Sequence, residues 1–160
     1  MNKKYFQDIW ADEMSYCFGC GRNNDQGLRI KSYWDGDEAI CIWTPEEHHK
    51  AAENVLCGGI IATLIDCHCL NTVTATIAKK EGREKDDQII FPYATGSIHI
   101  DLLKATPLNS PVELRAKVTK ILEKKIFVKC SLFSKGIECV RGEIVAVKVP
   151  ENFWKKGSSN

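Results

Sequence analysis

The chain has 160 residues, a length typical of a single domain. Its 22 Lys and Arg residues against 21 Asp and Glu leave a net charge of +1, which argues against a protein that mainly coats nucleic acid or an anionic membrane. Hydrophobic residues make up 44% of the chain and charged ones 27%, so a folded protein is expected and disorder is not. We expect one domain over residues 1–160, with an N-terminal arm over 1–26 and a flexible tail over 155–160.

Eight cysteines are a high count for this length. The first residues include two lysines but no apolar segment after them, and no stretch reaches 18 uncharged apolar residues. Neither a signal peptide nor a membrane span is therefore expected, and the reducing cytoplasm is the expected compartment. Cys17 and Cys20 have the spacing of a zinc-binding pair, which His48, His49 or the segment 67–69 could complete. Because a second well-spaced pair is missing, we expect no metal.

The predicted elements begin with a short helix or arm over residues 1–16. A hairpin follows, with strands over 28–34 and 38–43 joined by the turn sequence Asp35-Gly36-Asp37. The proline-free segment 58–80 is too long for a typical strand and is apolar nearly all round, which predicts a buried helix.

The remainder of the chain predicts strands separated by turn residues, arranged as an antiparallel meander. Alternating or apolar segments place three of these strands at 97–102, 112–119 and 126–132, and a last strand follows the turn Lys135-Gly136 and ends with residues 144–149. A helix that is apolar all round has to be covered on most sides. We therefore expect the α+β class, with one long buried helix wrapped by a curved antiparallel sheet of about five to six strands.

Two glycines open the predicted helix. Because they lack Cβ atoms, Gly58 and Gly59 let a ligand approach the N–H groups of the first turn, which suit an anion or a developing oxyanion. A tight turn before the helix would explain the same pair.

Asp66 lies two turns further along the predicted helix, among small and apolar neighbours. A carboxylate there is costly unless it is paired or used, and it could attack a substrate carbonyl or activate a water. The alternative is a polar residue that emerges at the helix edge. His68 lies about 200° around the helix from Asp66, so it is expected on another face, with Cys67 and Cys69 in the core.

Several segments together resemble one protein family. They are Cys17-Phe18-Gly19-Cys20-Gly21, Gly27-Leu28-Arg29-Ile30, Gly58 to Asp66, Thr95-Gly96-Ser97 and Thr106-Pro107-Leu108. In this order and spacing they are similar to the PaaI-type acyl-CoA thioesterases, over roughly residues 17–149. The resemblance implies a hotdog fold and a homodimer or homotetramer with sites at the dimer interface. It also implies hydrolysis of acyl-CoA with no metal and no cofactor, since the coenzyme A is part of the substrate.

The resemblance also assigns roles to site residues. Gly59 would supply the backbone N–H that polarises the thioester carbonyl, and Asp66 of the facing subunit would be the nucleophile or general base. Thr95 would help to position the water or Asp66. Gly58 and Cys57 would lie against the substrate, with Cys57 where the family carries the histidine of its His-Gly-Gly motif.

A second departure from the family lies upstream of the helix. Ala51 stands where many relatives carry an Asn that binds the carbonyl. His49 matches a histidine common in one branch of the family and is expected to contact the substrate instead.

Two other functions stay open at this point. A non-catalytic acyl-CoA-binding module on the same fold is disfavoured by Asp66, because binding alone gains nothing from a buried carboxylate. A hotdog dehydratase or hydratase needs a histidine in a proline-rich loop, and the segment 48–54 has the histidines without the prolines. The acyl group stays open as well, although four apolar residues could line its pocket: Leu64, Leu70, Val73 and Phe91.

Overall fold

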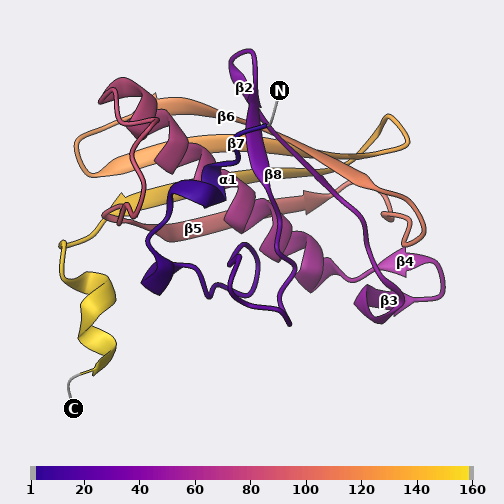
Figure 1. Ribbon diagram of the computed structural model, residues 1–160. Coiled ribbons are helices and arrows are strands. Elements are labelled where there is room, and N and C mark those ends of the chain that lie inside the picture. The colour runs from indigo at the N-terminus through magenta and orange to yellow at the C-terminus, as the bar shows by residue number, and fades with distance from the viewer. Residues whose placement is uncertain (1–2, 159–160) are drawn as a thin grey trace.

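The structure, a computed structural model, describes residues 3–158. One long helix, α1 (Gly58–Lys80), lies across a curved six-stranded antiparallel sheet (Figure 1). The strands of this sheet are β1 (Ser32–Asp35), β2 (Glu38–Trp43), β5 (Tyr93–Leu102), β6 (Val112–Ile121), β7 (Lys125–Ser134) and β8 (Ile137–Lys148). Their order across the sheet is β1-β2-β6-β7-β8-β5. The predicted α+β class, with one helix on a curved sheet, is confirmed.

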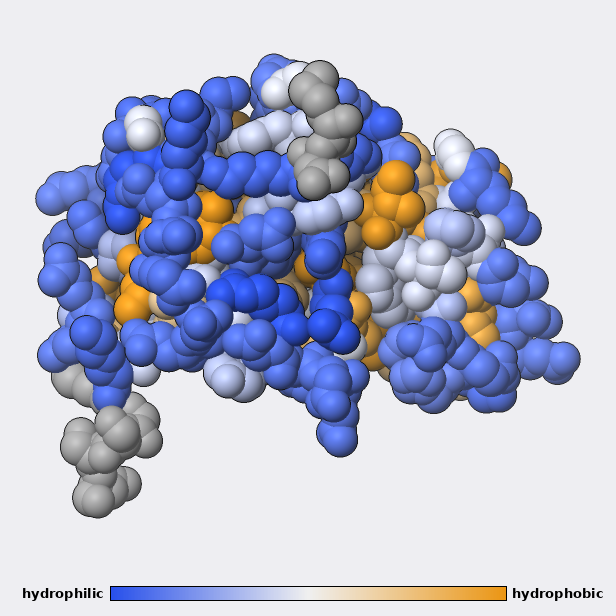
Figure 2. Space-filling view, in the orientation of Figure 1, coloured by the Kyte–Doolittle hydropathy of each residue, from blue (hydrophilic) through white to orange (hydrophobic). Residues whose placement is uncertain are grey.

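Smaller elements complete the chain. A two-stranded ladder, β3 (Lys50–Ala52) with β4 (Val55–Leu56), leads into α1 and was not predicted. The 3-10 helices are η1 (Phe6–Ile9), η2 (Asp12–Met14), η3 (Glu47–His49) and η4 (Phe153–Ser158). The space-filling view shows a mostly hydrophilic face with separate apolar patches between the polar side chains (Figure 2).

The central helix α1 covers the predicted range 58–80. It begins after the extended residue Cys57 and ends at Lys80, followed by the capping residue Glu81 and by Gly82, which takes a left-handed φ of +67°. By length and composition α1 would also suit a membrane span, but 61% of that segment is buried inside the fold. This degree of burial is typical of a core helix. The apolar residues of α1 are therefore explained by its packing inside the fold.

Close contact between α1 and β8 depends on a residue without a side chain. A Cβ atom added at Gly142 would lie 2.6 Å from Cγ2 of Ile65, which is fully buried on the helix. The backbone of β8 therefore approaches α1 more closely than any larger residue would allow.

Three predicted strand features are wrong. The first strand begins at Ser32 and not at residue 28, because Arg29 has φ +53° and the N–H groups of Leu28 and Ile30 bond to the loop 17–21. The sheet is a meander only over β6, β7 and β8, since β5 lies at the far edge beside β8 and β2 pairs with β6. Strand β5 also begins at Tyr93, four residues before the predicted start.

The N-terminal arm packs against the body of the fold. Phe6 and Ile9 of η1 are buried, and the Gln7 side chain bonds to both the backbone N–H and the hydroxyl of Ser32. At the other end, η4 extends into the segment expected to be a flexible tail, whose residues 159–160 lie outside the described residues.

Candidate functional site

The structure joins two of the predicted site residues, one on α1 and one on β5. Thr95 Oγ1 donates a hydrogen bond of 2.6 Å to Asp66 Oδ1. Both side chains are half-buried. Burial raises the pKa of Asp66, and the hydrogen bond from Thr95 opposes that rise. The carboxylate is therefore a stronger base than an exposed Asp while one of its oxygens is held in place.

A β-bulge in β5 sets the position of Thr95. Thr95 pairs with Ala146 of β8, but Ser97 pairs with the adjacent Val145, so Gly96 is an extra residue in the ladder. A Cβ atom at Gly96 would lie 2.6 Å from Cγ1 of Val147. Since bulges redirect the neighbouring side chains, this glycine and its bulge account for the contact of Thr95 with α1.

The first turn of α1 leaves its N–H groups accessible, as expected from Gly58 and Gly59. The first helical hydrogen bond runs from the N–H of Ile61 to the carbonyl of Cys57, so the N–H groups of Gly58 and Gly59 have no partner within the helix. A Cβ atom at Gly59 would meet only Cys57 Sγ, at 3.8 Å. The first turn thus presents N–H donors and the positive end of a 23-residue helix to an approaching group.

Gly59 and Asp66 lie at separate points along α1. They are seven residues apart, which at 1.5 Å per residue is about 10 Å along the axis. The two groups of one chain are therefore not within hydrogen-bond distance of each other.

His49 is placed in the segment before α1, and its ring is buried. Its Nδ1 accepts a hydrogen bond of 2.9 Å from the backbone N–H of Glu46, and its ring lies 4.9 Å from that of Trp43. Burial, with His48 nearby, lowers its pKa. The carbonyl of His49 accepts the N–H of Cys57 at 2.9 Å, so His49 holds the residue from which the helix starts.

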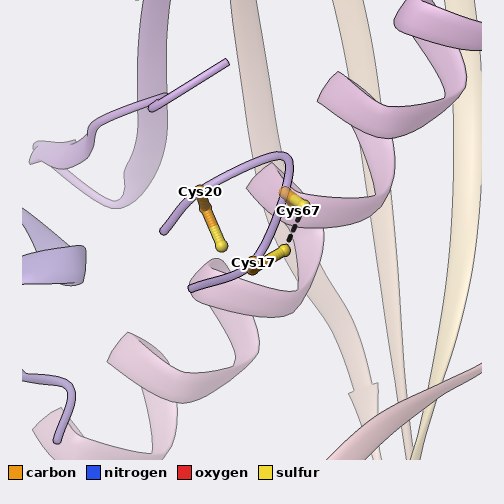
Figure 3. Close-up of side chains that lie close together, drawn as sticks. All are labelled: Cys17, Cys20 and Cys67. Carbon is orange, nitrogen blue, oxygen red and sulfur yellow. Dashed lines mark hydrogen bonds between the residues drawn. The ribbon is translucent and has the colours of Figure 1, made fainter. Parts of the chain in front are cut away.

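Three cysteines come together on the outer side of α1. The Sγ atoms of Cys17, Cys20 and Cys67 all lie within 4.8 Å of one another (Figure 3). Cys67 is buried as predicted, and its sulfur meets the loop 17–21. Of the candidates that could complete the Cys17 and Cys20 pair, the crossing of loop and helix brings Cys67 of the segment 67–69 to it.

The charged segment that follows α1 forms ion pairs within itself. Arg83 pairs with Glu81 and with Asp86. Of the residues that could line an acyl pocket, Leu64 and Val73 are fully buried in the core, whereas Phe91 borders a cavity of about 420 Å³ together with Ile77 and Tyr93. A second cavity, of about 540 Å³, lies beside the N-terminal arm and is lined by Phe6, Ile9, Tyr33, Trp34 and Ala75 among others.

Comparison with known proteins gives consistent structural neighbours. No family model matches the chain, and no curated protein matches it. A thioesterase superfamily protein from Shewanella loihica PV-4 is 31% identical, with 76% of this chain and 91% of that chain covered and a TM-score of 0.62. The mouse thioesterase superfamily member 2 is 18% identical, covering 73% and 84% of the two chains with a TM-score of 0.58. The protein PH1136 from Pyrococcus horikoshii is 12% identical, covering 94% and 97% with a TM-score of 0.64.

Proposed function

This chain belongs to the thioesterase superfamily, and we propose that it hydrolyses acyl-CoA thioesters at a site shared between two copies of the chain. The hydrogen-bonded pair of Asp66 and Thr95 carries the proposal. A half-buried carboxylate on a helix, with a raised pKa and held by a hydroxyl of the neighbouring strand, is suited to activating a water. Eight free thiols fit the reducing cytoplasm as the place of action.

The proposed reaction assigns a role to each end of the site. The N–H of Gly59 in one copy polarises the thioester carbonyl, while Asp66 of the other copy takes a proton from the attacking water. The water oxygen bonds to the carbonyl carbon, and the oxyanion that forms is held at the first turn of α1. Its collapse breaks the C–S bond, and the thiolate of coenzyme A takes the proton from Asp66. Direct attack by the Asp66 carboxylate is the alternative first step.

The substrate-facing wall of the site would be formed by three further residues: Gly58, Cys57 and His49. Gly58 and Cys57 adjoin the N–H donors at the start of the helix. His49 holds Cys57 through its carbonyl, which supports a role in shaping this wall. The site needs no metal or separate cofactor for the reaction.

The separation of about 10 Å between Gly59 and Asp66 on one helix supports a site shared between two copies. The surface beside the helix start supports it. Strand β5 is a sheet edge, and Ile98, Leu102 and Leu103 on or next to it are 44%, 59% and 45% exposed. Apolar side chains on an exposed edge favour burial against a partner. We propose a homodimer, or a homotetramer built from it, as the active form.

Replacing Thr95 with Val is expected to lower kcat by about 10- to 150-fold, because a hydrogen bond to a charged group is worth about 1.5–3 kcal/mol. Val keeps the branched shape but cannot donate to Asp66. Thr95→Ser is the matched control, since it keeps the hydroxyl. A positioning role predicts a fall in kcat with little change in KM for Thr95→Val and near-normal kcat for Thr95→Ser; equal kinetics in all three proteins would contradict it.

The proposed function is tested by incubating the purified chain with short, long and aromatic acyl-CoAs and measuring the release of free coenzyme A. Turnover of at least one member of the panel supports hydrolysis and identifies the acyl class. Binding of acyl-CoA by calorimetry with no turnover would overturn the proposal and favour the non-catalytic binding module.

A further inference from the structure

The loop 17–21 crosses the outer side of α1 where Cys67 emerges (Figure 3). Sγ of Cys17 and Sγ of Cys67 are 3.7 Å apart, and the Cys20 sulfur lies within 4.8 Å of both. Two thiolates on one tetrahedral zinc, each about 2.3 Å from the ion, are about 3.8 Å apart. We propose that Cys17, Cys20 and Cys67 bind one zinc ion, with the fourth position open to solvent.

The backbone of the loop holds the three sulfurs in place before any ion arrives. A Cβ atom at Gly19 would lie 2.3 Å from Cys67 Sγ and 2.9 Å from Cγ2 of Thr63, so the loop backbone rests directly on the helix. The N–H of Gly21 bonds to the carbonyl of Cys17 at 2.8 Å. A Cβ atom at Gly21 would meet the backbone of Cys17 at 2.5 Å, so the turn between the two ligands is closed tightly.

The loop is also tied to the following chain. The N–H of Leu28 donates to the carbonyl of Phe18 at 2.8 Å, and the N–H of Ile30 donates to the carbonyl of Gly19 at 3.1 Å. These two bonds fix the part of the loop between Cys17 and Cys20. A site whose ligands are held by their own backbone loses little conformational entropy when the ion binds.

The exposure of the three cysteines indicates where the fourth ligand of the zinc ion would bind. Cys67 is buried and Cys20 is half-buried, but Cys17 is exposed. The open side of the cluster therefore faces solvent at Cys17, where a water molecule can complete the tetrahedron. A disulfide is the competing outcome, and it would require two of these sulfurs to approach to about 2.05 Å.

The test measures zinc on the full chain kept reduced with a non-coordinating phosphine. We expect one zinc ion per chain by elemental analysis, and a cobalt-loaded protein with the intense visible absorption of a tetrahedral thiolate site. At a zinc concentration about 100-fold above its Kd, Tm is expected to rise by roughly 5–10 °C.

Single Ser substitutions assign the ligands. Cys17→Ser, Cys20→Ser and Cys67→Ser should each lose the bound ion and the cobalt absorption, whereas Cys139→Ser, a buried cysteine in β8, should keep both. If Cys67→Ser does not fold, Cys17→Ser still decides the matter, because its side chain is exposed. A folded wild-type chain that binds no zinc would overturn the proposal. Zinc binding by Cys17→Ser equal to that of the wild type would also overturn it. So would a disulfide between two of the three cysteines that persists in the presence of the phosphine.

Discussion

Replacing Asp66 with Asn is expected to lower kcat for acyl-CoA hydrolysis by about 100- to 10,000-fold, the usual loss when a general base is removed. Asn keeps the size of the side chain, and its carbonyl oxygen can still accept the hydrogen bond from Thr95. It cannot take a proton from water or attack a carbonyl at neutral pH. Steady-state kinetics with the best substrate of the acyl-CoA panel measures the loss.

A mixing experiment separates a shared site from one contained in a single chain. Gly59→Pro removes the oxyanion-binding N–H at a position in the first helical turn, where proline is tolerated. In random mixed dimers of Asp66→Asn and Gly59→Pro chains, about a quarter of the sites would combine an intact Gly59 with an intact Asp66. Activity should recover to about that fraction. No recovery after demonstrated subunit exchange would argue against the shared site, and unchanged kcat for Asp66→Asn would exclude the carboxylate mechanism.

Acid is expected to destabilise the fold between pH 6.5 and about 4 because of His68. This ring is fully buried, its Nδ1 lies 2.9 Å from Ser32 Oγ, and its Nε2 lies 3.1 Å from the carbonyl of Ala39. Burial lowers the pKa of His68 to about 4, from 6.5 in an unfolded chain. The unfolded state therefore binds more protons in this window, so the free energy of unfolding decreases as pH falls, by up to about 3 kcal/mol.

His68→Gln is the matched variant for this effect. Its amide can also reach two polar partners, but it does not titrate. The difference in unfolding free energy between wild type and variant should shrink as pH falls from 6.5 to 4, as measured by urea denaturation at each pH. Because carboxylates titrate in both proteins, the difference isolates His68. A difference that stays constant across the window would contradict the assignment.

Local sequence patterns predict the elements whose structure depends on residues close together in the chain. The segment 58–80 is too long for a strand and is apolar on every side, and the structure forms α1 over that range. The Asp-Gly turn at 35–37 joins β1 and β2 as predicted. Both features depend on contacts between residues close in the chain, which periodicity and turn chemistry express directly.

The candidate site was predictable in part, for a related reason. Gly59 and Asp66 lie on one helix, so their spacing could be read from the chain. Thr95 was assigned by resemblance alone, and the bulge at Gly96 that brings it to Asp66 depends on pairing with β8. The roles of His49 and Cys57 stay predictions, with a backbone bond between them as the observed contact.

The sequence by itself thus determined the fold class, the central helix and the carboxylate on it, because these follow from local patterns. Only the tertiary structure decided the strand order, the start of β1 after the left-handed Arg29, and the meeting of the loop 17–21 with Cys67. Each of these depends on contacts between segments that are far apart in the chain. Such contacts form only when the whole domain packs, so no local pattern contains them.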